Sequence, residues 1–342
     1  MKQNCNGIEP YDEATSVDGV EFCQDDILLA NIRPYLKKAW KAEFNGACST
    51  DVLSIKPIGI NADFFFHCIE KDDFFNYVMS AAKGSKMPRG DKQHIMEYTI
   101  HMPSEAEQRI ISKFIELITK RISEQQKLVD SLKLYKRGVI TAIFDRKFRF
   151  TKPDGTPYPE WSSVPFGDII IEYNDRTKSE NEDILLSAAI EGMFLNTELF
   201  GHQRGSSNIG YKKIKKGTLV LSTQNLHLGN ANVNLRFEHG MVSPAYKTYH
   251  IKGCSQELMY HWIKREETKQ FFFNATTVGA SACRRNVEWE TLYSQVIELP
   301  SIEEEVVVVR FLNAMDNICI QQETLLTQLL ALKKTLLQQM FI

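Results

Sequence analysis

The side chains of this sequence that are best suited to chemistry are basic and amide residues gathered in loops. Lysine and arginine bind phosphate oxygens, and Arg, Lys, Asn and Gln can read base edges through paired hydrogen bonds. Aromatic residues interleave with them, as Tyr35 and Trp40 do. We therefore consider these residues as candidates for contact with a nucleic-acid duplex. The candidates are Arg33, Lys37, Lys38, Lys86, Arg89, Gln203, Arg204, Lys212, Lys213, Lys215, Gln224, Asn225, Arg284 and Arg285.

Each group of candidates also has a structural interpretation. The lysine run at residues 212–216 is typical of a solvated surface. Arg89 and Arg284 correspond at an offset of 195 (284 minus 89), with Gly84 and Gly279 at the same offset. That recurrence favours either a DNA contact or a tie between a loop and the end of a helix, and the sequence leaves both open.

The sequence carries no catalytic motif that we recognise. It has no Asn-Pro-Pro-Tyr run, no GxxxxGK phosphate loop and no HExxH pair. The eight histidines show no ligand spacing, and the seven scattered cysteines include no CxxC. His67 and His261 recur within apolar stretches, which favours packed structural histidines. We expect a non-catalytic, cytoplasmic chain with reduced thiols and no metal, cofactor or membrane segment of its own.

These loops are positioned by a stretch that the chain contains twice. Residues 103–145 and 300–342 align without a gap at an offset of 197 (300 minus 103). Unrelated stretches of that length would share roughly two or three identities. The identical pairs are Pro103/Pro300, Ser104/Ser301, Glu107/Glu304, Phe114/Phe311, Gln125/Gln322, Leu128/Leu325, Leu132/Leu329, Lys136/Lys333 and Phe144/Phe341.

Each copy predicts a long helix. A Ser followed three residues later by Glu is a capping box, and apolar residues then recur at a period close to 3.5, which is typical of a coiled coil. A helix of roughly 40 residues spans about 60 Å and could serve as a spacer. The predicted seam contains Phe114, Ile118, Gln125, Leu128 and Leu132 in the first copy and Phe311, Met315, Gln322, Leu325 and Leu329 in the second.

The regions before the two helices also repeat. Strands are predicted at residues 27–30 and 51–55 and a helix from residue 62 to 82, and Leu28-Leu29-Ala30 corresponds to Leu219-Val220-Leu221. The predicted fold is α+β, with two mixed α/β domains, each followed by a long helix, and the helices pair as an antiparallel coiled coil. The predicted domains are residues 1–102, 103–150 (helix and linker), 151–299 and 300–342.

The alignment leaves the opening of the second domain without a partner. The residues from Tyr158 to Ile169 have no counterpart in the first domain, which therefore lacks roughly 40 N-terminal residues. We expect either a fragment or a partial, recombining copy.

This architecture resembles the DNA-specificity (S) subunit of type I restriction-modification systems over the whole chain. The resemblance rests on Trp161 with Phe166-Gly167-Asp168-Ile169, on the two Pro-Ser-x-x-Glu helix starts and on the basic loops before them. It implies that each globular domain is a target recognition domain that reads half of a bipartite duplex DNA sequence. It also implies docking of methyltransferase (M) subunits, two by expectation, on the helices and their junctions, and of restriction (R) subunits. S-adenosylmethionine and ATP would bind those partners.

Two other interpretations stay open. The chain could be a partial or silent copy of such a subunit. It could also be a coiled-coil protein scaffold that does not read DNA. Binding measured at several salt concentrations separates the scaffold from a DNA reader, because phosphate contacts make affinity fall steeply with salt.

Overall fold

The computed structural model describes residues 1–9, 19–201, 207–281 and 284–341. Contacts divide the chain into two compact units, Met1–Val129 with Gln321–Ile342, and Asp130–Ile320. Two long helices, α4 (Glu105–Phe144) and α9 (Ile302–Met340), each contribute a part to both units. Within the described ranges, no helix is both long and apolar enough to cross a membrane.

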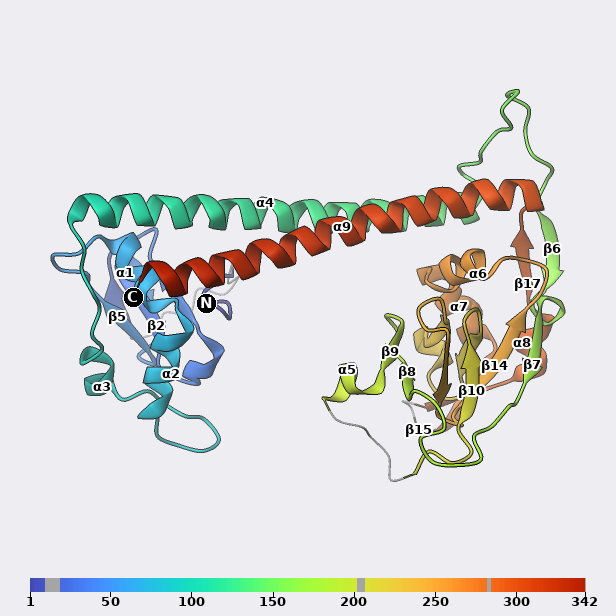
Figure 1. Ribbon diagram of the computed structural model, residues 1–342, viewed down its shortest axis with the longest axis horizontal. Coiled ribbons are helices and arrows are strands. Elements are labelled where there is room, and N and C mark those ends of the chain that lie inside the picture. Colours follow the sequence, from blue (N-terminus) through green and yellow to red (C-terminus); the bar gives the residue numbers. More distant parts are fainter. Residues whose placement is uncertain (10–18, 202–206, 282–283, 342) are drawn as a thin grey trace. The chain divides into compact units, whose positions relative to one another are not determined.

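A three-stranded antiparallel sheet forms the centre of the first unit (Figure 1). Ile27 and Leu29 of its middle strand pack against two short helices, whereas Leu28 packs with Phe22 and Trp40 in a second cluster. The middle strand is therefore buried on both faces. The elements are β1 (Val20–Phe22), β2 (Ile27–Ala30), η1 (Pro34–Leu36), β3 (Ala39–Lys41), β4 (Gly46–Cys48), β5 (Val52–Ile55), α1 (Ala62–Ile69), α2 (Asp72–Ser80) and α3 (Lys92–Met96), with the sheet order β3-β2-β5.

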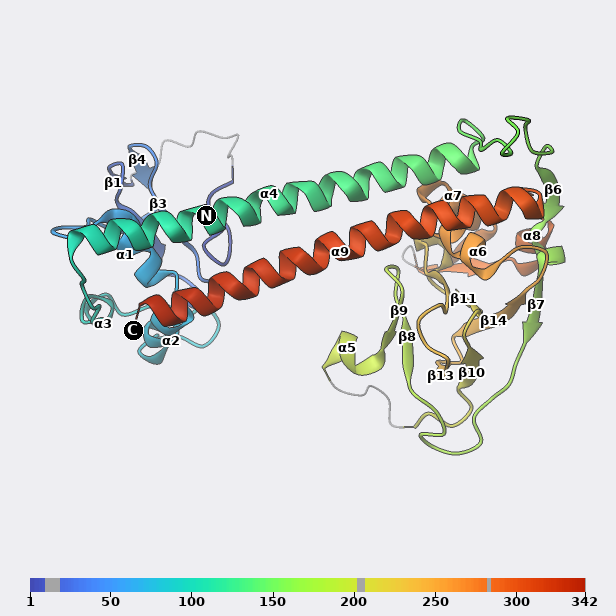
Figure 2. The same cartoon turned by 45° about the horizontal axis from the view of Figure 1, so that its top comes forward.

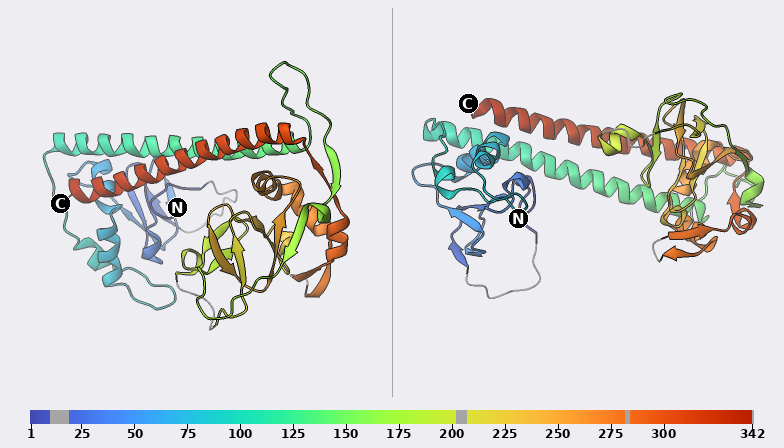
Figure 3. Two further views of the ribbon diagram at one scale, coloured as in Figure 1. Left: turned by 45° about the vertical axis from the view of Figure 1, so that its right-hand side comes forward. Right: turned by 90° about the horizontal axis from the view of Figure 1, so that it is seen from below.

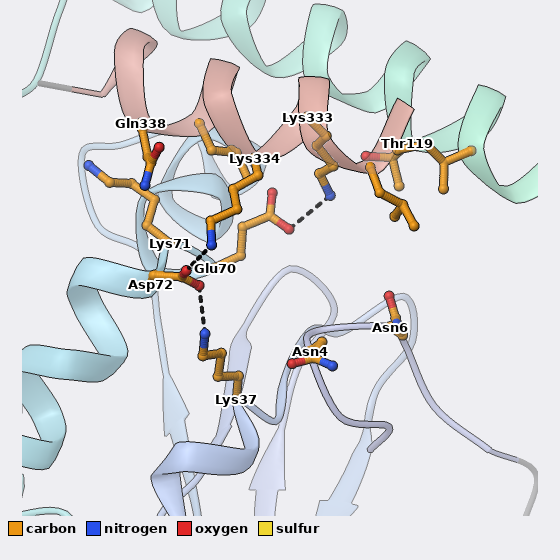
Figure 4. Close-up of a pocket in the computed structure, with 13 residues that line it drawn as sticks. Asn4, Asn6, Lys37, Glu70, Lys71, Asp72, Thr119, Lys333, Lys334 and Gln338 are labelled. Carbon is orange, nitrogen blue, oxygen red and sulfur yellow. Dashed lines mark hydrogen bonds and ion pairs between the residues drawn. The ribbon is translucent and has the colours of Figure 1, made fainter. Parts of the chain in front are cut away.

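The single helix predicted from residue 62 to 82 is wrong, since the structure has two helices there. Lys71 is extended (φ −67°, ψ 149°) and separates α1 from α2. The break turns polar side chains toward the C-terminal part of α9, which belongs to the same unit (Figure 4). Glu70 Oε2 lies 3.0 Å from Lys333 Nζ, and Lys71 Nζ donates to the Phe341 carbonyl oxygen at 2.6 Å. The break between α1 and α2 therefore lies where Glu70 and Lys71 contact α9.

A four-stranded antiparallel sheet, β12-β11-β14-β7, forms the centre of the second unit. Leu219 and Leu221 of its β11 strand share a core with Leu258 and Phe272 of two helices. The elements are β6 (Ser162–Pro165), η2 (Phe166–Ile169), β7 (Ile170–Tyr173), β8 (Leu186–Ala188), β9 (Met193–Leu195), α5 (Asn196–Phe200), β10 (Lys212–Lys215), β11 (Leu219–Ser222), η3 (Leu226–Leu228), β12 (Ala231–Val233), β13 (His239–Val242), β14 (Tyr246–Ile251), α6 (Gln256–Ile263), α7 (Glu266–Asn274), β15 (Thr276–Ser281), β16 (Arg284–Val287), α8 (Trp289–Ser294) and β17 (Val296–Leu299).

The sheets β3-β2-β5 and β12-β11-β14 share one pattern of pairing, but the predicted strand alignment is off by one residue. Ile27 pairs with Ile55, and Leu219 pairs with Tyr249. The turn after each middle strand ends in a left-handed residue, Lys37 (φ 49°) or Gly229 (φ 86°), at an offset of 192 (229 minus 37). Ile27 therefore corresponds to Leu219. A shift of one residue matters because it moves every side chain to the opposite face.

Both units fasten the helix after the sheet to a long helix through the same contact. The Asn61 backbone N–H donates to Gln108 Oε1 at 2.9 Å, and the Ser255 N–H donates to Glu305 Oε1 at 2.5 Å. These pairs correspond at offsets of 194 (255 minus 61) and 197 (305 minus 108). The two recurring histidines lie at corresponding positions of these helices, and both are buried. His67 is hydrogen-bonded to Glu70, and His261 is hydrogen-bonded to Asn313.

The long helices pair in antiparallel fashion within each unit, which confirms that part of the predicted fold (Figure 2). In the first unit Gln125 Nε2 donates to Gln322 Oε1 at 2.9 Å, and in the second Lys136 forms an ion pair with Asp316. Residue numbers rise along α4 as they fall along α9. Both glutamines belong to the predicted seam, and one is the duplicate of the other.

Two residues of the predicted seam lie outside it. Phe114 and Leu128 are 44% and 45% exposed, whereas their neighbours Ile115 and Val129 are buried. A seven-residue repeat that keeps Gln125 inside places residues 115, 118, 122, 129 and 132 inside as well. On α4 the other predicted positions, Ile118 and Leu132, are half-buried; on α9 Met315 is buried and Phe311, Gln322, Leu325 and Leu329 are half-buried.

Candidate nucleic-acid interface

In the first unit, backbone bonds bring two loops with basic side chains together. The 3-10 turn η1 follows the middle strand β2 and starts at Arg33, which is in the left-handed conformation (φ 51°). The Arg33 N–H donates to the Pro88 carbonyl at 2.7 Å, and Arg89 forms bridges with Ile32 and Lys83. The sequence separates these loops by about fifty residues, and the fold makes them one exposed surface.

Two cations on this surface are neutralised and two are available. Arg89 lies 3.1 Å from Asp51, and Lys83 lies 2.9 Å from Asp91. Arg33 and Lys86 are exposed and have no ion-pair partner among the described residues. Tyr35 of the η1 turn and Met87 beside Lys86 are about half exposed. Exposed positive charge in a loop suits contact with a phosphate backbone.

The other two candidates of the first unit differ in role. Lys37 caps the end of η1 and pairs with Asp72 at 2.6 Å. Hydrogen bonds from Lys334 and from Lys37 hold the pKa of Asp72 below its ordinary range. Lys37 therefore serves the packing of α2 and lines a cavity of about 460 Å³ that also contains Lys333 and Lys334 (Figure 4). Lys38 is half-buried next to it.

The second unit builds the corresponding surface from the turn η3 and the strand β16. Gln224 and Asn225 are exposed, and Asn225 stands at the start of η3 where Arg33 stands at the start of η1 (225 minus 33 is 192). Arg285 donates to the Thr276 Oγ1 at 2.7 Å and to the Thr276 carbonyl at 2.9 Å, over the Phe273 ring. These bonds fix its guanidinium in place.

The sequence did not single out His227, although it lies within this surface. Burial, and after it the charge of Arg285, lowers the pKa of the His227 imidazole, so the neutral ring is favoured. A neutral imidazole can both donate and accept a hydrogen bond. His227 corresponds to Tyr35 at the offset of 192 (227 minus 35), and this correspondence was the available signal. Both turns therefore present a planar ring beside a cation.

Several predicted contacts do not join this surface. Lys212 is only 5% exposed, and burial lowers the pKa of its ammonium, so its assignment as a surface contact is corrected. Lys213 is paired with Glu182, while Lys215 is exposed on β10, which belongs to a different sheet from β11. Gln203 and Arg204 lie outside the described residues. Arg284 opens β16, and its side chain lies outside the described part of the chain.

The fold has counterparts among solved structures. A chain from a structure described as the structural basis of complex assembly and conformational transition of the type I R-M system matches 94% of this chain and 83% of its own length, with a TM-score of 0.59 and 16% identity. The S subunit of a type I restriction-modification system from M. genitalium matches 100% of this chain and 90% of its own, with a TM-score of 0.54 and 11% identity. In fold, the chain is like a type I specificity subunit.

One curated protein adds a sequence likeness. The specificity subunit of the type I restriction enzyme EcoDI of Escherichia coli is 26% identical over 129 residues. The match spans 38% of this chain and 29% of the length of that protein. No protein-family model matches the sequence. The chain is thus similar to specificity subunits in its fold and, over one stretch, in its sequence.

Proposed function

We propose that this chain is the non-catalytic DNA-reading subunit of a type I restriction-modification complex and that it recognises a bipartite duplex target. The observation that carries the proposal is the repeated surface beside the turns η1 and η3. Each unit places an exposed polar residue at the start of that turn, Arg33 or Asn225, next to a second loop or strand with arginine. Arginine can bind phosphate or form paired hydrogen bonds with guanine, and asparagine can form paired hydrogen bonds with adenine.

Partner subunits complete the proposed assembly. M subunits, two by expectation, would bring S-adenosylmethionine and the methyl-transfer chemistry, and R subunits would bring ATP and the nuclease. The chain itself would bind duplex DNA and these proteins alone. The likeness in fold to specificity subunits supports this division, together with a sequence that has no Asn-Pro-Pro-Tyr run, GxxxxGK loop or HExxH pair.

Selection of bound duplexes from a randomised library, with the chain co-purified with its M subunit, tests the proposal. Two short motifs with a fixed gap are the expected result. A single enriched motif would restrict sequence reading to one unit and contradict the bipartite target. Absence of enrichment, with binding that does not change with salt, would favour the scaffold without DNA reading or a silent copy.

Substitution of the two available cations of the first unit should weaken DNA binding. For each of Arg33→Ala and Lys86→Ala we expect affinity to fall severalfold and the slope of log K against log salt to fall by about 1, because each change removes a phosphate contact. Fluorescence anisotropy of a labelled duplex measures both quantities. Lys56→Ala, also exposed in the first unit, is the control and should change neither. An unchanged slope for both test variants would remove this surface from the DNA interface.

The outer face of the long helices is the proposed docking surface for the M subunit. Leu128 and Tyr135 lie one heptad apart on α4 and are 45% and 61% exposed, although both are apolar or aromatic. We expect Leu128→Asp with Tyr135→Asp to reduce the yield of co-purified M subunit by at least about tenfold, since interface cores exclude charge. Lys120→Asp, an exposed change elsewhere on α4, is the control. Full retention of the M subunit by the double variant would disprove this surface.

A further inference from the structure

The segment at residues 149–173 covers the start of α9 in the second unit. Arg149 lies 3.0 Å from Glu304 Oε2, and the Trp161 indole N–H donates to the same oxygen at 3.0 Å. The Phe150 ring lies 5.4 Å from the Phe311 ring. Glu304 is 1% exposed as a result. The segment thus supplies a cation, an indole donor and an aromatic ring to one patch of the long helix.

The same segment adds two strands and a turn to the globular part of the second unit. The β6 strand pairs with β17 along Val296–Leu299, and β7 pairs with the outer edge of β14 (Figures 1 and 3). The turn η2 packs so closely on α8 that a Cβ added to Gly167 would lie 2.8 Å from the Tyr293 Cβ. Residues 149–173 are therefore an integral layer of the second unit.

In the first unit the described residues leave the corresponding surface exposed. Met102 is 59% exposed, whereas its counterpart Leu299 is 7% exposed (299 minus 102 is 197). Phe114, the counterpart of Phe311, is 44% exposed. Glu107, the counterpart of Glu304, is exposed and bonds only to Ser104 of its own capping box within the described structure. The chemistry that binds residues 149–173 is therefore repeated without its occupant.

A cavity marks the place where the strand and turn would fit. It measures about 290 Å³ and is lined by Ser54 and Ile55 of β5 and by Ile95 and Met96 of α3. Tyr249 and Tyr293 correspond to Ile55 and Met96 (249 minus 55 is 194; 293 minus 96 is 197), and in the second unit they contact β7 and η2. Among the described residues, β5 is the last strand of its sheet on this side. An edge strand of this kind accepts an added strand.

A solvated helix face is the simpler explanation, and the comparison of the two units argues against it. Leu117 on α4 is 57% exposed, and its counterpart on α9, Ala314, is exposed too. Phe114 and Met102 differ from Leu117 because their counterparts are covered. The uncovered positions follow the footprint of residues 149–173 rather than the helix surface in general.

We propose that this face of the first unit is a docking site for a strand-forming polypeptide segment with the chemistry of residues 149–173. An arginine of that segment would pair with Glu107, and an aromatic ring would pack on Phe114. Its first strand would pair with residues 99–102, which correspond to β17, and its turn would enter the cavity beside Met96. Binding at this face would complete the first unit and does not depend on DNA reading.

A fluorescent peptide with the sequence of residues 147–173 tests the proposal when it is titrated into the full chain. We expect saturable 1:1 binding, protection of residues 99–102 from hydrogen exchange, and at least tenfold weaker binding for Phe114→Asp and for Glu107→Lys. Leu117→Asp, which adds the same charge nearby on α4, should bind the peptide as the unchanged chain does. A peptide with Phe150→Ala and Trp161→Ala should bind at least tenfold more weakly.

Three outcomes would overturn the proposal. The first is absence of peptide binding at concentrations up to about 100 μM. The second is equal binding by Phe114→Asp, Leu117→Asp and the unchanged chain, with protection of residues 296–299 in place of 99–102, which would mean exchange into the second unit. The third is concentration-dependent dimerisation through this face that excludes the peptide, which would make a second copy of the chain the occupant. Circular dichroism of each variant shows that it is folded.

Discussion

Replacement of Glu304 with alanine is expected to lower the free energy of unfolding of the second unit by about 1–3 kcal/mol. The Glu304 carboxylate is 1% exposed and accepts hydrogen bonds from Arg149 and from the Trp161 indole. Its removal leaves the Trp161 indole N–H without an acceptor and takes one partner from the Arg149 guanidinium, which keeps Glu160 and the carbonyls of Tyr158 and Pro159. A buried donor that loses its acceptor costs about 1–3 kcal/mol. The buried Trp161 makes tryptophan fluorescence during urea unfolding a suitable measurement.

Glu107→Ala is the matched control, because the duplication places the same residue at the same point of α4. Glu107 is exposed and accepts from the Ser104 N–H at 3.0 Å, so its loss removes only a capping contact. We expect a much smaller shift in the urea midpoint for Glu107→Ala than for Glu304→Ala. Equal shifts for the two variants would mean that the buried contacts of Glu304 with Arg149 and Trp161 add no more stability than the capping contact of Glu107.

The positions of the two long helices were predictable because duplication and helix periodicity repeat the same information twice. The capping boxes predicted from Ser104 and Ser301 lie next to the first helical residues, Glu105 and Ile302. The Glu107 N–H does donate to Ser104 Oγ, at 3.4 Å. A local signal of this kind needs no knowledge of the surrounding fold. The same holds for the strands β2 and β5, whose apolar runs matched the prediction.

The phase of the helix seam was harder to predict. Phe114 and Ile115 are adjacent and both apolar, and so are Leu128 and Val129, so spacing alone cannot decide which of each pair faces inward. The structure selects Ile115 and Val129 because Gln125 meets Gln322. The local spacing of apolar residues cannot predict which residue faces inward when that depends on a contact between distant segments.

The sequence predicts which basic residues are candidates for the interface, but it does not predict which loops the fold brings together. Arg33 and Arg89 were chosen for their charge, but only the backbone bridge between Ile32 and Arg89 makes their loops one surface. The prediction for Lys212 is wrong because every residue of a lysine run looks equivalent in sequence. In the structure β10 buries Lys212, half-buries Lys213 and exposes Lys215. His227 was missed because its counterpart is Tyr35, a different residue type.

The two units have also diverged in charge at one equivalent position, which a search for identities cannot detect. Glu70 corresponds to Lys264 (264 minus 70 is 194). Lys264 Nζ donates to the carbonyls of Ile190 and Ala231 and to Asn232 Oδ1, and burial lowers its pKa to about 8. Glu70 contacts Lys333 of α9. The same site therefore fastens a β-hairpin in one unit and a long helix in the other.

Glu70→Gln should lower the stability of the first unit by about 3 kcal/mol near neutral pH, because it removes one charge of a buried ion pair. The Glu70 side chain is 6% exposed and lies 2.7 Å from His67 Nδ1 and 3.0 Å from Lys333 Nζ. Burial alone would raise the pKa of Glu70, but the hydrogen bond from His67 and the charge of Lys333 lower it below the ordinary value of 4.5. The folded state therefore stabilises the ionised Glu70 carboxylate relative to the unfolded state.

The sign of the pH dependence follows from this lowered pKa. A carboxyl with a depressed folded-state pKa contributes its full stability above its unfolded value and loses it as pH falls through the folded value. The difference between the unchanged chain and Glu70→Gln should thus be constant above about pH 4.5 and shrink below it. Asp72→Asn, which removes a carboxylate that is 34% exposed, is the control and should cost less, since solvent screens its pairs with Lys37 and Lys334. Hydrogen exchange of α1 at several pH values measures both effects. A difference that grows on acidification would show that Glu70 is protonated in the folded protein and that the contact with α9 is not ionic.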